Sequence, residues 1–154
     1  MRIRSLVVGR PRDPEAATLH DRYASRLRRL GVSYETAWVS EVRAGGQFSD
    51  RHVREREARL LEERLGDREA VIALDGKGQQ VSSEQLARRI GGFARREAAF
   101  VVGGPLGLDR SFLARADWVW SLSALTFPHE LVRVILVEQL YRALMLARGL
   151  PYHK

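Results

Sequence analysis

The sequence contains no cysteine and, among its 26 basic residues, only two lysines, Lys77 and Lys154. The absence of cysteine excludes disulfides, iron–sulfur clusters, cysteine-ligated zinc and thiol catalysis, and we expect no structural metal. No apolar run approaches the roughly 18 residues of a membrane span, and the N-terminal run 3–9 is too short for a signal peptide. These absences predict a cytosolic protein that does not bind membranes.

Basic charge is in excess: 26 basic against 19 acidic residues give a net charge of +7. The other 24 basic residues are arginines, a bias that is typical of the coding composition of the source genome. The net positive charge is more informative, because it favours an anionic partner such as nucleic acid.

The length of 154 residues fits a single domain, and we find no internal repeat or linker that would divide the chain. Short apolar runs typical of buried strands alternate with segments of helical periodicity, and four of these helices are expected to start at the capping residues Asp13, Ser49, Ser82 and Asp109. The expected strands are 3–9, 32–39, 70–74, 100–102 and 118–122. This alternation predicts an α/β fold with a mainly parallel sheet of five or six strands and helices on both faces.

Three loops in the C-terminal half, 75–80, 103–108 and 122–127, each follow an expected strand. The first begins with the turn residues 75–78, Asp-Gly-Lys-Gly, which are expected to end the strand before it. Ligands of such sheets bind at the carboxyl ends of the strands, so we expect the site there. The glycines of the second loop allow close approach of backbone to a ligand, although such a turn is also commonly structural. Neither a dinucleotide fingerprint nor a phosphate-binding Gly-Lys-Ser/Thr loop is present, which leaves nucleotide hydrolysis with little support.

The four histidines differ in their surroundings. His20 and His52 lie in charged helical stretches and are expected at the surface. His129 follows Pro128 at the start of the last helix, beside a predicted ligand loop, whereas His153 lies in the C-terminal tail. The alternatives are a structural role for His129 and, for His153, disorder of the C-terminal tail.

The last predicted helix, from Pro128 to about Arg148, is apolar on nearly all sides in its first half. It must therefore be buried in more than one direction, as in a dimer interface. Glu138 and Arg142 lie four residues apart on one face, which indicates either an intrahelical ion pair or a functional pair.

Specific stretches in the second half carry a family resemblance. They are 74–77 with 82–83, 100–104 with 107–108, 122–129, 131–143 and 151–154. In this order they resemble the RlmH (YbeA-like) family, SPOUT-class methyltransferases that act on N3 of a pseudouridine in 23S rRNA. The block 126–129, Thr-Phe-Pro-His, and the Tyr-His-Lys ending are the specific parts, while residues 1–70 agree only in pattern.

The resemblance implies a trefoil knot within about 71–154, a homodimer, and S-adenosylmethionine as the methyl donor for 23S rRNA of the assembled ribosome. Its cofactor contacts map onto Leu74, Gly103, Gly104, Leu122, Ser123, Ala124, Leu125, Thr126 and Phe127. Most of these contacts are expected from backbone groups. Many family members carry lysine where this chain has Ala124, so no side-chain contribution is expected there.

Methylation of N3 requires removal of an imide proton and close approach of the methyl donor. We expect His153, or less favourably His129, to assist proton removal. Arg142 is expected to stabilise negative charge and Tyr152 to position the base. The tail of one subunit is a candidate to complete the site of its partner.

Two alternatives stay open: a SPOUT methyltransferase with another RNA target such as tRNA, and a non-catalytic RNA-binding module associated with the ribosome. Residues 1–30 hold eight arginines against three acidic residues and are a candidate RNA-facing surface. Charge reversal at Arg22 and Arg26 would test that surface.

Overall fold

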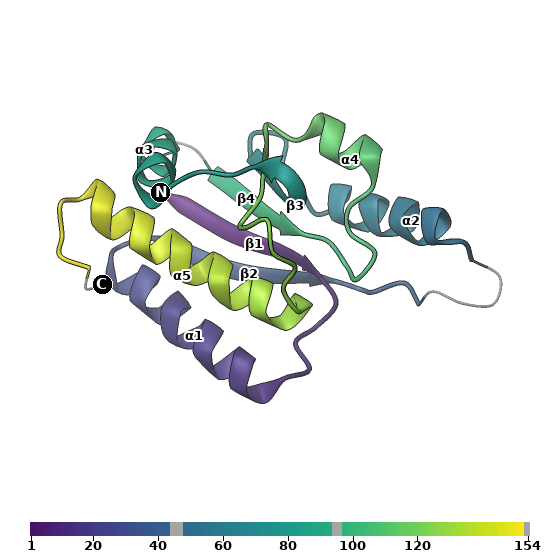
Figure 1. Ribbon diagram of the computed structural model, residues 1–154, viewed down its shortest axis with the longest axis horizontal. Helices are drawn as coiled ribbons and strands as arrows, with labels where there is room; N and C mark the ends of the chain where they lie inside the picture. The colour runs from purple at the N-terminus through teal and green to yellow at the C-terminus, as the bar shows by residue number, and fades with distance from the viewer. Residues whose placement is uncertain (44–47, 94–96, 153–154) are drawn as a thin grey trace.

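Strands and helices alternate without exception in the computed structural model, which describes residues 1–43, 48–93 and 97–152. In chain order the elements are β1 (Arg2–Val8), α1 (Pro14–Arg29), β2 (Ser33–Val39), α2 (Asp50–Glu62), β3 (Ala70–Gln79), α3 (Ser83–Gly92), β4 (Glu97–Val102), α4 (Arg110–Arg115), β5 (Trp118–Trp120) and α5 (His129–Ala147). Figure 1 shows the strands as one twisted layer between two layers of helices.

The five strands form one sheet in the order β2-β1-β4-β3-β5, and every neighbouring pair is parallel. Helices α1, α3 and α5 pack on one face, where the larger apolar cluster includes Leu27, Leu86 and Leu136. Helices α2 and α4 cover the other face through Leu61 and Phe112. The predicted α/β fold with a parallel sheet covered on both faces is confirmed, and the trefoil knot stays a prediction.

Polar side chains fix where the helices begin. Asp13, Ser49 and Asp109 each accept hydrogen bonds from backbone N–H groups of the first turn that follows them. Ser82 and Gln85 form a reciprocal capping box at the start of α3. Because these caps satisfy N–H groups that have no partner within the helix, they hold each helix start beside the end of the preceding strand or loop.

The expectation that the chain turns away from the sheet at 75–78 is wrong, because β3 continues to Gln79. Its pairing with β5 shifts register between Leu74 and Gln79, which is the signature of a bulge. At Gly78 a Cβ atom would lie 2.7 Å from the backbone carbon of Trp120. Glycine therefore lets the bulged strand pass close to β5.

His20 is buried, contrary to the expectation of a surface position. Its Nε2 lies 3.3 Å from both the Tyr34 hydroxyl and the Thr36 hydroxyl of β2. Tyr34 in turn hydrogen-bonds Ser5 of β1 at 2.7 Å. The histidine thus belongs to a polar network between α1 and the sheet.

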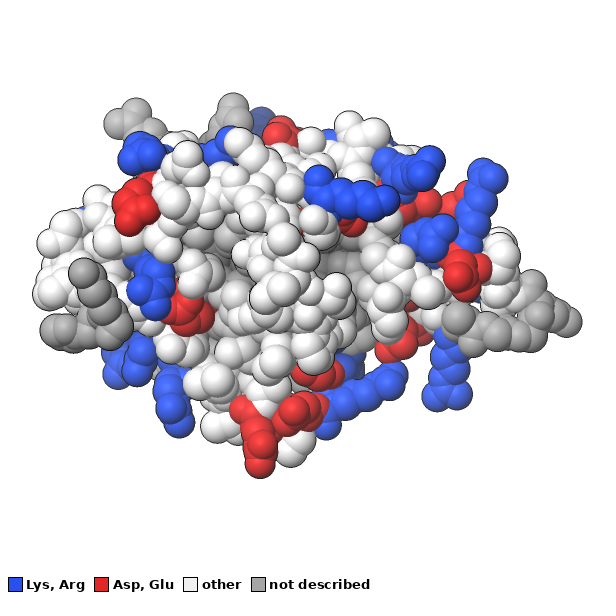
Figure 2. Space-filling model, viewed as in Figure 1, with Lys and Arg blue, Asp and Glu red and all other residues white. Residues whose placement is uncertain are grey.

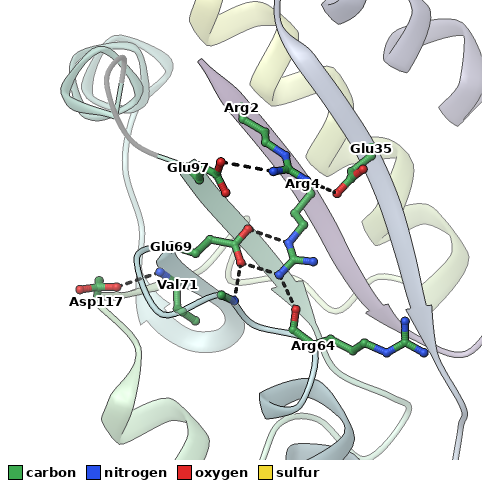
Figure 3. A network of polar contacts seen from close by, with 9 residues as sticks. Arg2, Arg4, Glu35, Arg64, Glu69, Val71, Glu97 and Asp117 are labelled. Carbon is green, nitrogen blue, oxygen red and sulfur yellow. Dashed lines mark hydrogen bonds and ion pairs between the residues drawn. The ribbon is translucent and has the colours of Figure 1, made fainter.

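Ion pairs join the amino ends of the strands (Figure 3). Arg2 contacts Glu35 at 3.4 Å and Glu97 at 3.2 Å, so it bridges the starts of β2 and β4. Arg4 donates from Nε to Glu69 at 2.6 Å, just before β3. The side chains of Arg4 and Glu69 are 15% and 5% exposed, so this pair is a structural one inside the protein.

Candidate active site

A cavity of about 590 Å³ lies at the carboxyl ends of β3, β4 and β5. All nine residues that the family resemblance assigns to the cofactor line it: Leu74, Gly103, Gly104, Leu122, Ser123, Ala124, Leu125, Thr126 and Phe127. His129 lines it as well. The three segments predicted as loops, the first of which is part of β3, therefore converge on one cavity, as expected for ligand sites of parallel α/β sheets.

The glycine loop after β4 forms one wall of this cavity and is tightly folded. Gly107 has a φ of +78° and donates its N–H to the Gly104 carbonyl at 2.9 Å. A Cβ atom at Gly103 would lie 2.9 Å from the Gly107 backbone, and one at Gly104 would lie 2.8 Å from Glu57. The loop leaves no room for side chains at these two positions, so its backbone forms the cavity wall.

The loop after β5 forms another wall of the cavity, and hydrogen bonds within the loop fix its conformation. The Ser121 hydroxyl donates to the Ser123 carbonyl at 2.9 Å, and the Ser123 hydroxyl accepts from the Leu125 N–H at 3.0 Å. Leu125 is 73% exposed at the rim. These local bonds fix a turn whose remaining backbone groups are available to a ligand.

His129, the first residue of α5, is tied to the end of β1. Its Nε2 lies 3.1 Å from the Val8 carbonyl oxygen, which can only accept, so Nε2 carries the hydrogen and Nδ1 the lone pair. Burial, assisted by the positive charge of Arg133, holds the pKa of His129 below its ordinary value. His129 is therefore a neutral imidazole at neutral pH, with a nitrogen that can accept a proton.

Arg133 is a buried cation one turn after His129. Its side chain is 5% exposed, and its Nη2 donates to the carbonyls of Val8 and Gly9 at 3.3 and 2.9 Å. Its guanidinium lies 5.0 Å from the centre of the Trp38 ring, and Glu130 is 3.6 Å away. The end of β1 thus binds Nη2 of Arg133, whereas Nε and Nη1 have no hydrogen-bond partner among the described residues.

Glu57 of α2 is a buried carboxylate that sequence reasoning missed. One oxygen accepts from the Val42 N–H at 2.9 Å, while the other has no partner among the described residues and faces Gly104. Burial raises the pKa of Glu57. The signal was visible in the sequence, since Glu57 lies four residues from both Val53 and Leu61 on the apolar stripe of its helix.

Arg142 and Tyr152 lie away from the cavity. Both bind Glu138: the Arg142 Nη2 and the Tyr152 hydroxyl each lie 2.8 Å from the same carboxylate oxygen. Arg142 also lies 4.3 Å over the Tyr152 ring. Burial and the carboxylate raise the pKa of the Tyr152 phenol, so it stays protonated and donates to Glu138.

The predicted catalytic residues are thus not brought together within one chain. From His129 to Arg142 the helix rises by about 20 Å, given 1.5 Å per residue. His153 lies outside the described residues. The pairing of Glu138 with Arg142 across one helical turn is present as an intrahelical ion pair that also holds the start of the tail.

Among residues 1–43, 48–93 and 97–152, no three potential ligands gather in a way that could hold a metal ion. Over the same residues, no helix combines the length and apolarity that crossing a bilayer requires.

Comparison with known proteins assigns the class first. A family model described as a predicted SPOUT methyltransferase matches residues 1–153, nearly the whole chain. The fold and the convergent loops are thus those of a SPOUT-class methyltransferase.

Similar proteins then narrow the assignment. The chain is 45% identical to ribosomal RNA large subunit methyltransferase H of Alkalilimnicola ehrlichii, an alignment that covers 100% of this chain and 99% of that protein. It is 42% identical to the protein of the same name from Anaeromyxobacter and 37% identical to that from Acetivibrio thermocellus. Each of these alignments covers 100% of this chain and 100% of the other protein. The chain belongs to the ribosomal RNA large subunit methyltransferase H (RlmH) family.

Proposed function

We propose that this protein transfers a methyl group from S-adenosylmethionine to N3 of a pseudouridine in 23S rRNA of the assembled ribosome, and that it acts in the cytoplasm. Family membership over the full chain supports a methyltransferase, and the names of the relatives support ribosomal RNA as its substrate. The observation that carries the proposal is the convergence of the three loops and His129 on one cavity.

The cavity fits the proposed methyl donor in size and chemistry. Its volume lies within the range of roughly 300–1,000 Å³ that is typical of small-molecule sites. Leu74, Val102 and Phe127 offer apolar walls, and the glycine loop offers bare backbone. When bound, S-adenosylmethionine supplies an electrophilic methyl group on a sulfonium, and the residues of the three loops would hold it.

Proton removal from N3 needs a group that accepts a proton at the cavity. His129 lines the cavity, and its neutral ring carries a lone pair on Nδ1 because Nε2 donates to Val8. His153 remains the other candidate, through the tail of a partner subunit. Substitution of each separates the two: the proton acceptor is the histidine whose loss abolishes transfer on ribosomes while donor binding by calorimetry persists.

We propose further that the site is shared between the subunits of a homodimer. Arg142 lies about 20 Å along α5 from His129, and Tyr152, beyond the end of α5, packs against Arg142, so both would reach a cavity only in a second copy of the chain. The face over the first half of α5 and the loop before it lacks charged side chains at its centre (Figure 2). Leu125 and Leu131 are exposed there, at 73% and 44%, which suits an interface between copies.

The function is tested by incubating the protein and labelled S-adenosylmethionine with ribosomes from a strain that lacks the gene. Mass spectrometry of the 23S rRNA should reveal one added methyl group on a pseudouridine. Methylation of free tRNA instead would identify another RNA target. Absence of donor binding by calorimetry would indicate a non-catalytic module.

Mixing two inactive variants tests the shared site. Gly103→Val blocks the cavity, and Tyr152→Ala removes the tail contact with Glu138. If each site combines the cavity of one subunit with the tail of the other, mixed dimers keep one intact site. An equal mixture should then regain about a quarter of wild-type activity, since half of its dimers are mixed. No recovery after subunit exchange would show that each site belongs to one chain.

A further inference from the structure

A second hollow lies beside the donor cavity, at the carboxyl ends of β1 and β2. It is a groove of about 530 Å³ bounded by the loops after these two strands and by the end of α2. Four of its lining residues are arginines and two are glutamates: Arg10, Arg12, Arg43, Arg64, Glu41 and Glu63. We call this hollow the basic groove.

The charges of the basic groove are only partly neutralised. Arg12 pairs with Glu41 at 2.8 Å. In the described part of the chain no carboxylate pairs with Arg10, Arg43 or Arg64, and all three are exposed. Glu63 alone opposes these three cations, so the groove has a net positive charge. Unpaired guanidinium groups around a concavity favour an anion with several oxygens.

The basic groove and the donor cavity meet at two neighbouring residues, Val8 and Gly9. Gly9 lines the groove, and the carbonyl of its neighbour Val8 binds His129 of the cavity at 3.1 Å. Gly9 has a φ of +79°, and a Cβ there would lie 3.3 Å from Glu41. The backbone of Val8 and Gly9 thus lies between the two hollows, with the side chains of Glu41 and Arg133 beside it.

We propose that the basic groove binds phosphate groups of the rRNA strand next to the nucleotide that enters the donor cavity. This inference rests on the proposed function, because it takes rRNA as the substrate. Arginine matches the geometry of phosphate with two parallel hydrogen bonds. Phosphate contacts fix the position and orientation of nucleic acid without reading its sequence. Arg10 and Arg43, which come from different loops, are the contacts that set this register.

The arginines of α1 belong to the competing RNA-facing surface that residues 1–30 suggest, and they offer the matched comparison. Arg22 and Arg29 are exposed on that helix and line neither the donor cavity nor the basic groove. Arg26 is unsuitable, because its guanidinium lies 5.0 Å over the Tyr23 ring and its reversal would disturb packing. The double variant Arg22→Glu, Arg29→Glu changes the net charge by the same amount as Arg10→Glu, Arg43→Glu.

The test measures binding of the full-length chain to ribosomes that lack the methyl group, by co-sedimentation over a series of KCl concentrations. The variant Arg10→Glu, Arg43→Glu should lose affinity by about tenfold for each phosphate contact, and the slope of log affinity against log salt should become shallower by about one per contact. The value of kcat/KM should fall in parallel. The α1 variant should change affinity by less than about twofold, since screened distant charges contribute little.

Folding and donor binding are checked in the same variants. Donor affinity by calorimetry and the melting temperature should match those of the wild type in both double variants. The variant Arg10→Lys, Arg43→Lys should retain the salt slope, because it retains the charge, while losing part of the affinity that comes from paired hydrogen bonds.

Equal losses in the groove and α1 variants, or a larger loss in the α1 variant, would overturn the proposal. So would a wild-type protein that does not sediment with ribosomes at low salt. Failure of the proposed function looks different: the wild type would bind ribosomes and transfer no methyl group. The comparison of salt slopes would still decide the role of the groove in that case.

Discussion

The two ends of the sheet use the same residue type in opposite ways. At the amino ends, Arg2 and Arg4 are bound by carboxylates of neighbouring strands and loops. At the carboxyl ends, Arg10 and Arg43 surround a groove and lack such partners among the described residues. Arg2 and Arg4 therefore connect elements of the fold, whereas Arg10 and Arg43 leave positive charge available to a ligand.

The difference shows that composition cannot separate structural from functional arginines. Of the eight arginines in residues 1–30, only Arg10 and Arg12, which follow β1, line the basic groove. The carboxyl ends also carry the glycine loop and His129, whereas the amino ends carry neither. Substitutions at the two ends should therefore alter different properties of the protein.

The largest effect is expected at the carboxyl ends, from Gly103→Ala. Its Cβ would lie 2.9 Å from the Gly107 backbone, so the cavity wall must shift. Donor affinity measured by calorimetry should fall by about 100-fold, a loss of about 2.7 kcal/mol. Gly76→Ala is the control, because Gly76 lines the same cavity and a Cβ there meets nothing within 4 Å. Unchanged donor affinity in Gly103→Ala would show that this wall does not contact the donor.

At the amino ends, Arg4→Met should reduce stability and spare catalysis. The substitution leaves the Glu69 carboxylate, 5% exposed, without its cationic partner. The free energy of unfolding should fall by about 2 kcal/mol, less than for a pair with no solvent contact. Urea denaturation measures this loss, and kcat/KM per folded molecule should stay at the wild-type value. A lower kcat/KM for fully folded Arg4→Met protein would contradict the expectation that the amino ends affect stability alone.

The free energy of unfolding should depend on pH through His129, which lies at the carboxyl ends of the strands. The pKa of His129 is lowered in the folded protein, so the unfolded chain takes up a proton that the folded protein does not. The contribution of His129 is therefore constant above its unfolded pKa of about 6.5 and is lost progressively as the pH falls below that value. In urea denaturation, His129→Asn should weaken the decline in stability below pH 6.5 relative to wild type.

The control for this pH dependence is His52→Asn, since His52 is exposed on α2. It should follow the wild-type curve throughout. Identical curves for wild type and His129→Asn would mean that burial and the charge of Arg133 do not lower the pKa of His129 in the folded protein.

The smallest effect is expected from Arg2→Gln, also at the amino ends. Arg2 contacts two carboxylates, but its side chain is 51% exposed, and water screens such pairs strongly. Neither the melting temperature nor methyl transfer should change measurably. A clear drop in melting temperature would show that the exposed pairs in Figure 3 act together with the buried pair of Arg4.

Local signals in the sequence were sufficient for most of the fold. Apolar runs located the five strands, and Asp13, Ser49, Ser82 and Asp109 located the helix starts, because caps act within one turn. The expected turn at 75–78 failed because the pairing of β3 depends on the backbone of Trp120, some forty residues later. His20 failed for the same reason: its buried partners belong to β2.

The site was predictable in part. The rule that ligands bind at the carboxyl ends of parallel strands brought the three loops together, and the cavity there is lined by every residue assigned to the cofactor. The separation of Arg142 from His129 follows from the predicted helix, Pro128 to about Arg148, which agrees with α5. The position of Glu57 against Gly104 required the packing of α2 on the glycine loop, which no local pattern reveals.

The Val8 carbonyl is a shared acceptor for His129 and Arg133, so the end of β1 and the start of α5 form one mechanical unit. If RNA bound in the basic groove displaced the loop after β1, the wall of the donor cavity would move with it. Thermodynamic linkage then makes the effect mutual: whatever factor bound RNA applies to donor affinity, bound donor applies to RNA affinity. Phosphate groups in the basic groove and the donor in its separate cavity would then affect each other's binding through one oxygen atom.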